Sequence, residues 1–278
     1  MSIFGKKGKR TQKGRSIQTE RKHLLSPKSD FFIREAYKTL RTNVSFALPD
    51  EEGCKVIVVT SSMQGEGKSI TALNMAISHA MADRKVLLID CDLRRPKLAR
   101  LLQMGSKVGL SNLIVNPRLL DEAIKHTRLS GLDVILSGNV PPNPSELLGS
   151  GRMDALLEQL KEHYDYIFLD SPPVNMVTDA VVLAPKSDGV IFLVRAGRSE
   201  RGAVVHAVEQ LEYAKAKILG FVLNGVDVQR ARYGYRKGHY RRYFRYGKYQ
   251  YARGYRYGYS STMPSPYVAD ILQDEDAT

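Results

Sequence analysis

Two glycines, a lysine and a serine follow a short run of β-branched residues and could bind a phosphate group. Residues 56–59 read Val-Ile-Val-Val, which is typical of a buried strand. A loop with Gly65 and Gly67 comes next, and Lys68 and Ser69 open a stretch with apolar residues at helical spacing. In such a unit the backbone N–H groups and the helix N-terminus face an anion. Lys68 can then reach the outer phosphates, and the Ser69 hydroxyl can bind Mg²⁺.

The loop departs from the usual phosphate-loop pattern at one position. Ser62 stands where the pattern G-x4-G-K-[ST] has its first glycine. The flanking strand and helix are both in place, and a plain strand–helix turn would leave the run of glycine, lysine and serine unexplained. We therefore predict that the loop binds ATP through Gly65, Glu66, Gly67, Lys68, Ser69 and Ile70.

Three aspartates stand where other predicted strands end. Asp90 and Asp92 follow one apolar run, and Asp170 follows another. The carboxyl ends of parallel strands form the ligand-binding edge of an open α/β sheet, so we expect all three beside the glycine loop. Mg²⁺ keeps several waters and takes few carboxylates. We assign the metal to Ser69, Asp92 and Asp170, which leaves Asp90 to meet an attacking nucleophile.

The elements that position these residues follow an α/β pattern. Near-continuous apolar strands alternate with amphipathic helices, which indicates a parallel sheet flanked by helices on both faces. With the glycine loop, this is the P-loop NTPase class in a deviant form. Strands are predicted near residues 56–59, 86–89, 133–136, 166–170, 190–194 and 218–222. Helices are predicted at 31–47, 145–148, 152–162 and 200–214, and from Lys68 onward.

The first of these helices has two distinct sides. Ser29-Asp30 can cap its N-terminus. One side displays apolar residues at helical spacing, and the other places Glu35, Lys38 and Arg41 three residues apart. The apolar side consists of Ile33, Tyr37, Leu40, Val44 and Leu48.

The excess positive charge of the 278-residue chain, a net +13, is confined to its two ends. Residues 1–28 carry +8, residues 29–227 carry −1 and residues 228–278 carry +6. We expect a basic disordered arm at 1–28, an ATP-binding domain at 29–228 and a disordered tail at 229–278. The two cysteines exclude a disulfide framework and a C-x-x-C site. No apolar run approaches 18 residues and no secretory signal is present, so we expect a cytoplasmic protein.

The tail contains ten tyrosines within 27 residues, interleaved with glycine and arginine. Such a segment buries too little branched apolar surface to fold alone. Arginine and tyrosine together could bind nucleic acid through phosphates and bases. The other interpretation is that the tail is the substrate of the ATP site in its own chain. The candidate phosphoacceptors are Tyr233, Tyr235, Tyr240, Tyr243, Tyr246, Tyr249, Tyr251, Tyr255, Tyr257 and Tyr259.

Four ordered motifs resemble those of the bacterial tyrosine kinases of the polysaccharide co-polymerase type, in their stand-alone cytoplasmic form. The first is Gly65-Glu66-Gly67-Lys68-Ser69, which is similar to the family's modified Walker A. The second is D-x-D-x-R at residues 90–94, and the third is D-S-P-P at residues 170–173. The tyrosine cluster is the fourth. The resemblance covers about residues 30–260.

This resemblance implies ATP- and Mg²⁺-dependent autophosphorylation of the tyrosine cluster, in trans, in capsule or exopolysaccharide synthesis and export. It implies Asp90 as catalytic base, with Lys68 and Arg94 as further catalytic residues. It also implies a membrane co-polymerase that activates the kinase and recruits it to the inner face of the plasma membrane, a cognate tyrosine phosphatase, and no nucleic-acid partner. Ring-like self-association is implied through the helix bearing Glu35, Lys38 and Arg41, although lysine lacks arginine's bidentate geometry.

Two other classes share parts of this pattern. A partition-type ATPase has the same fold, and its basic aromatic tail would bind DNA. Such ATPases usually place a second lysine five residues before the Walker lysine, where this chain has Met63. An iron–sulfur carrier ATPase needs paired cysteines, which are absent from the sequence. Asn224, after the last predicted strand, is a candidate contact to the nucleotide base by analogy of fold alone.

Overall fold

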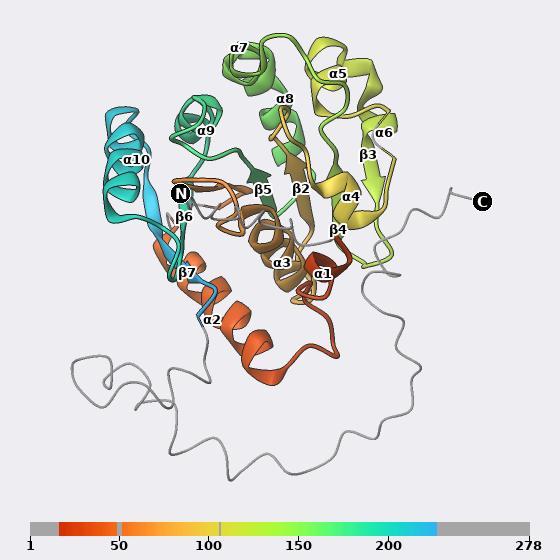
Figure 1. The fold of residues 1–278 in the computed structure, drawn as a ribbon. Helices are drawn as coiled ribbons and strands as arrows, with labels where there is room; N and C mark the ends of the chain where they lie inside the picture. Colours follow the sequence, from red (N-terminus) through yellow and green to blue (C-terminus); the bar gives the residue numbers. More distant parts are fainter. Residues whose placement is uncertain (1–16, 49–51, 106, 227–278) are drawn as a thin grey trace, which may run out of the picture.

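The computed structural model describes residues 17–48, 52–105 and 107–226, which form one seven-stranded sheet with helices on both faces (Figure 1). The strand order is β3-β4-β2-β5-β1-β6-β7. All pairs are parallel except β3–β4, which is antiparallel. The predicted parallel sheet with helices on both faces is confirmed, and the short edge strand β3, which was not predicted, makes the sheet mixed. The strands are β1 Lys55–Ser61, β2 Val86–Asp90, β3 Ile124–His126, β4 Leu132–Ile135, β5 Tyr166–Asp170, β6 Gly189–Arg195 and β7 Ile218–Asn224.

Alternate side chains of the central strands enter two separate cores. In β1, Ile57 and Val59 pack on one face of the sheet, whereas Val56 and Val58 pack on the other. Because both faces are covered, every position of the strand must be apolar, and this explains its continuous run of β-branched residues.

The helices divide between these two cores, with α2 and α3 below the sheet and α7 and α9 above it in Figure 1. On the first face lie α1 Ile17–Arg21, α2 Phe31–Ala47, α3 Lys68–Ala80 and α4 Leu98–Leu102. On the second face lie α5 Leu110–Val115, α6 Leu120–Ala123, α7 Pro144–Gly149, α8 Gly151–Lys161, α9 Asp179–Leu183 and α10 Arg201–Tyr213. Two 3-10 helices, η1 Pro117–Leu119 and η2 Ala184–Lys186, extend α5 and α9.

The packed domain begins earlier than the predicted boundary at residue 29. The buried Leu24 and Leu25, which follow helix α1, belong to the first core. The side chain of Asn74 in α3 accepts from the Leu25 N–H at 2.7 Å and donates to the His23 carbonyl at 2.9 Å. The prediction of a disordered arm through residue 28 is therefore wrong for residues 17–28, and its remainder lies outside the described residues.

Helix α2 begins as predicted, because the Asp30 carboxylate accepts from the Phe32 N–H at 2.8 Å. Its predicted apolar side packs on the first core at four positions, Tyr37, Leu40, Val44 and Leu48. Ile33 differs, with 44% of its surface exposed. None of the helices in the described ranges is long and apolar enough to cross a membrane.

The three charged residues of α2 do not share one surface. Glu35 and Lys38 form an exposed ion pair at 2.8 Å. Arg41 instead donates to the backbone carbonyl of Ser78 in α3, so its guanidinium holds α2 against α3. Among the described residues, Glu35 and Lys38 are therefore exposed side by side, whereas Arg41 is turned toward α3. The role of all three in self-association remains a prediction.

Candidate functional site

Adjacent strands bring the predicted catalytic carboxylates to one edge of the sheet. In the β2–β5 pairing Asp90 lies opposite Asp170, and in the β1–β5 pairing Val59 lies opposite Asp170. The carboxyl end of β1 leads directly into the glycine loop. The predicted convergence of Asp90, Asp170 and the loop is therefore confirmed, and it arises from the register of three neighbouring parallel strands.

The glycine loop adopts a conformation that requires glycine at two positions. Gly65 has φ +78° and Gly67 has φ +104°, both in the left-handed region. A Cβ at Gly67 would also lie 2.0 Å from the amide nitrogen of Asn224. Helix α3 begins at Lys68, and no side chain caps its first turn. The N-terminus of this 13-residue helix therefore presents backbone donors at the loop.

Lys68 extends from the first turn of α3 toward the carboxylates. The residue is only 8% exposed, and burial lowers its pKa. The charges of Asp170 and Asp92 act in the opposite direction, which places the ammonium near both. A buried cation beside two carboxylates at a helix N-terminus is well suited to hold an anionic phosphate chain.

Asp170 is the residue whose surroundings best fit a bound cation. Both of its oxygens are buried, and neither has a hydrogen-bond partner of ordinary geometry among the described residues. Burial raises the pKa of Asp170 to about 7, and the nearby Ser69 hydroxyl and Lys68 ammonium oppose this rise. Together with Ser69 and Asp92, these orphaned oxygens fit Mg²⁺, which prefers oxygen ligands and retains waters. No cluster of three His, Cys, Asp or Glu residues suited to a metal occurs in the described ranges.

Asp90 is fully buried at the end of β2. One carboxylate oxygen accepts from the Asp92 N–H at 3.2 Å, and the other accepts from the Leu98 N–H at 3.1 Å. Burial, followed by the charge of Asp170, raises the pKa of Asp90 well above its ordinary value. Asp92 is half-buried, and its carboxylate accepts from the Arg95 N–H at 2.9 Å. Asp90 is therefore buried and Asp92 is half-buried, which agrees with their different predicted roles as base and as metal ligand.

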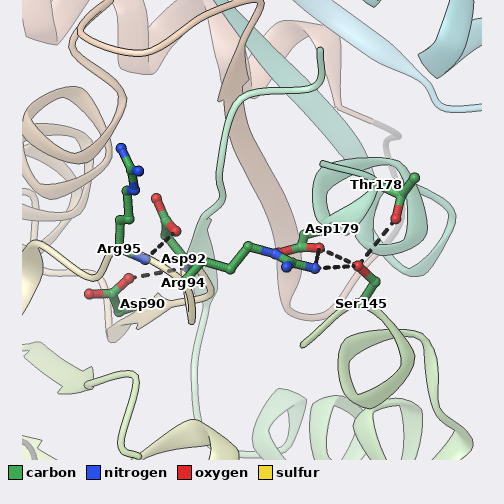
Figure 2. A network of polar contacts seen from close by, with 7 residues as sticks. All are labelled: Asp90, Asp92, Arg94, Arg95, Ser145, Thr178 and Asp179. Atoms are coloured by element: carbon green, nitrogen blue, oxygen red, sulfur yellow. Dashed lines mark hydrogen bonds and ion pairs between the residues drawn. The ribbon is translucent and has the colours of Figure 1, made fainter. Parts of the chain in front are cut away.

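Arg94 points away from this pair, as Figure 2 shows. Its guanidinium binds the buried Asp179 of α9 through two contacts, at 3.0 and 3.1 Å. It also donates to the Ser145 hydroxyl of α7 at 2.9 Å, and Ser145 in turn donates to Asp179. The position of Arg94 therefore does not support the predicted catalytic role; the side chain ties the loop after β2 to α7 and α9.

The Glu66 side chain turns into the loop rather than toward a nucleotide site. Its carboxylate is buried and accepts from the Ser62 hydroxyl at 3.1 Å, the Met63 N–H at 2.8 Å and the Ser199 hydroxyl. Ser62, at the position where the usual pattern has glycine, thus serves as a hydrogen-bond donor to Glu66. The Glu66 side chain is therefore occupied within the loop, and only the Glu66 backbone is left to make the predicted contact to the nucleotide.

Two further groups hold the loop from the side of β6 and β7. The Asn224 amide donates to the Glu66 carbonyl at 2.9 Å, and the Arg195 guanidinium donates to the Gly65 carbonyl at 3.0 Å. Asn224 thus contacts the loop backbone, and its contact to the nucleotide base stays a prediction. Sequence reasoning missed Arg195, Ser199 and Asp179, because no motif spacing connects them to the residues that they bind.

Comparison of the chain with known proteins shows the family to which it belongs. A family model described as an AAA domain matches residues 54–219. Tyrosine-protein kinase YwqD of Bacillus subtilis (strain 168) is 36% identical over 236 residues, which span 84% of this chain and 96% of that protein. The kinase domain of Escherichia coli tyrosine kinase ETK is 36% identical, with a TM-score of 0.67 over 70% of this chain and 76% of that one. The chain belongs to the bacterial tyrosine-protein kinases.

The activity of this family is the phosphorylation of protein tyrosine, and the P-loop NTPase class predicted from the sequence is confirmed. A more distant structure shares the fold alone. The septum site-determining protein MinD from Pyrococcus horikoshii OT3, solved with Mg-ADP, is 22% identical, with a TM-score of 0.52 over 61% of this chain and 70% of that one.

In this kinase, Glu66→Ala is expected to loosen the phosphate loop. The change leaves the Ser62, Met63 and Ser199 donors without their acceptor, and an unsatisfied buried group costs about 1–3 kcal/mol. We expect a loss of about 2–4 kcal/mol in unfolding free energy and roughly tenfold weaker ATP binding. Urea unfolding and calorimetric titration measure the two effects. Glu66→Gln, which keeps one acceptor oxygen, is the matched control and should lose less of both.

The stability of the kinase should also depend on pH through Asp170. Its folded pKa of about 7 lies above the unfolded value, so the native state binds more protons between about pH 4 and 7. This contribution to stability is present at low pH and is lost as pH rises through 7. Asp170→Asn should therefore gain about 2 kcal/mol relative to wild type between pH 5 and pH 8. A pH-independent difference in urea unfolding, without Mg²⁺ or nucleotide, would contradict this.

Proposed function

We propose that this kinase phosphorylates the tyrosine cluster of its own C-terminal tail, Tyr233 to Tyr259. The supporting observation is the place where the tail leaves the domain. Strand β7 ends at Asn224, whose amide binds the phosphate-loop backbone at 2.9 Å, and the described chain stops two residues later at Val226. The tail therefore starts beside the loop that holds the phosphate donor. The tyrosines themselves lie outside the described residues.

In this proposal the chain's own groups divide the work of phosphoryl transfer. Lys68 and the N–H groups of the loop bind the phosphates of ATP, and Ser69, Asp92 and Asp170 hold Mg²⁺. Bound Mg²⁺ supplies charge neutralisation on the transferring phosphoryl group. Asp90 accepts the phenol proton late in the reaction, because a loose transition state needs little nucleophile activation. Its raised pKa narrows the gap to the tyrosine value near 10.

We further propose that transfer occurs in trans, between copies of the chain. Tyr233 lies nine residues past Asn224 and reaches about 30 Å, whereas Tyr259 lies 35 residues past it and reaches about 115 Å. The distal tyrosines can therefore enter the site of a neighbouring copy. Self-association through the exposed Glu35–Lys38 face of α2 would bring copies together.

The biological setting that we propose is capsule or exopolysaccharide synthesis and export at the inner face of the plasma membrane. A membrane co-polymerase would recruit and activate the kinase, and a cognate phosphatase would reset it. The motifs that resemble those of the polysaccharide co-polymerase kinases support this setting. Stimulation of tail phosphorylation by purified co-polymerase fragments would support this setting.

A mixing experiment tests the tail and the trans mechanism together. A Lys68→Met acceptor with all its tyrosines is incubated with ATP, Mg²⁺ and an active donor whose ten cluster tyrosines are phenylalanine. We expect phosphotyrosine on the acceptor, located by mass spectrometry at residues 233–259. Label on wild type but none on the acceptor would exclude trans transfer. Label on wild type outside the tail would exclude the tail as substrate.

A further inference from the structure

A groove lies beside the active site and has no assigned role. It has a volume of about 990 Å³ and is walled by α5, the loop after β4, α7 and the start of α8. Its surface is mainly apolar, and Val115 and Val140 line it with 60% and 66% of their surfaces exposed. Pro141 and Pro142 complete this apolar wall. Large side chains of this kind, exposed together in a concave surface, indicate a binding site for a peptide or protein.

The groove adjoins the catalytic edge of the sheet. Its loop follows the carboxyl end of β4, which is the strand next to β2 and two places from β5. At a strand spacing of about 4.8 Å, the ends of β4 and β5 are roughly 10 Å apart. Helix α7 connects the two places directly, because Ser145 binds Arg94 of the active-site loop while Glu146 and Leu147 line the groove. The groove therefore lies on the same edge of the sheet as the reacting groups.

The last residues of the chain differ in composition from the tyrosine-rich run before them. Residues 228–259 contain ten Lys or Arg residues and no acid, whereas residues 262–278 contain four acids and no Lys or Arg. The apolar residues Val268, Ile271 and Leu272 follow Tyr267 at a spacing that puts them on one side of a helical turn. This end segment has the apolar and acidic character that an apolar, basic-rimmed surface binds.

The rim of the groove carries two arginines, beside one acid in its lining. Arg152 lines it, and the exposed Arg118 adjoins the lining residue Leu119. The one acid in the lining, Glu146, is engaged by the Asn143 amide at 2.9 Å. The 52 residues that follow Val226 could span about 170 Å, enough to reach a neighbouring copy.

We propose that the end segment, Tyr267–Leu272, of one chain docks in the groove of a neighbouring copy and presents the distal tyrosines to that copy's active site. The inference rests on the proposed function, since it takes the tail as substrate in trans. Tyr259 lies eight residues before Tyr267, within about 28 Å of the anchor, so Tyr255, Tyr257 and Tyr259 are modified first. The end segment is then a docking site, and the tyrosine run is the substrate.

A binding measurement tests docking without catalysis. A fluorescent peptide of residues 262–278 is titrated into the full-length chain carrying Ile271→Asp and Leu272→Asp, whose own tail end cannot compete. We expect saturable binding that Val140→Asp abolishes. Val205→Asp, at an apolar position on α10 that is 46% exposed, is the matched control and should bind as before. No binding, or equal binding to the Val140→Asp protein, overturns the proposal.

A transfer measurement tests the consequence. In the mixing assay, Ile271→Asp with Leu272→Asp in the Lys68→Met acceptor should lower the initial rate about tenfold, because the docking contact raises the local concentration of the tail. Val140→Asp in the donor should have the same effect, and Val205→Asp should have none. Equal rates for altered and unaltered acceptors overturn the presentation of the tyrosines. Peptide binding without transfer to any acceptor would leave docking in place and refute trans phosphorylation instead.

Discussion

Asp90→Asn is expected to lower tyrosine phosphorylation about 10²–10⁴-fold while ATP binding stays within about threefold. Asp90 is a fully buried acid at the end of β2 that is not assigned to the metal. It is held by the N–H groups of Asp92 and Leu98, which fix its orientation at the end of β2. Burial and the neighbouring Asp170 raise its pKa, so it is a better proton acceptor for a phenol than an ordinary aspartate.

The measurement is the initial rate of phosphotyrosine formation, with ATP binding followed separately by calorimetry. Asparagine keeps the shape of the side chain and one acceptor oxygen, so the melting temperature should change little. Asp92→Asn is the matched control, because it should raise the Mg²⁺ concentration needed for half-maximal rate and leave the rate at saturating Mg²⁺ nearer wild type. Transfer by Asp90→Asn at the wild-type rate would show that the residue is not the base.

The central strands could be predicted because burial on both faces demands continuous apolar runs. Strands β1, β2, β5 and β6 all have this property, and each lies in the middle of the sheet. Strand β3 could not be predicted in the same way. It has three residues, Ile124–His126, pairs only with β4 in the described sheet and is half-exposed, so it has neither an apolar run nor a clear alternation.

Motifs located the active site but did not orient its side chains. The spacing of Asp90, Asp92 and Arg94 places them on one loop, and only the fold shows that Arg94 extends to Asp179, 85 residues away. Glu66 is a similar case, because its partner Ser199 comes from the loop between β6 and α10. Such contacts depend on tertiary packing, which a local pattern does not contain. They are the contacts that set the shape of the phosphate loop.

The pair formed by Arg94 and Asp179 should be a major source of stability for the domain. Arg94→Met leaves the fully buried Asp179 carboxylate without its cation, and breaking a buried pair in this way costs about 3–5 kcal/mol. Because the Arg94 side chain is 38% exposed, we expect the lower end, about 3 kcal/mol, in urea unfolding. Asp179→Asn should cost less, since the unpaired Arg94 can reach water. A double-mutant cycle should give a coupling of about 1–3 kcal/mol.

The same variant separates a supporting role of Arg94 from a catalytic one. If Arg94 acts only through Asp179 and Ser145, Arg94→Met measured well below its melting temperature should keep transfer within about tenfold of wild type. Asp179→Asn should then lower the rate by a similar factor, because both changes release the same loop from α7 and α9. A folded Arg94→Met protein that loses as much activity as Asp90→Asn, beside an active Asp179→Asn protein, would restore the catalytic role predicted from the motif. The comparison therefore rests on the ratio of the transfer rates of the two folded variants, since a contact that acts only by holding this loop should affect transfer similarly when either partner is changed.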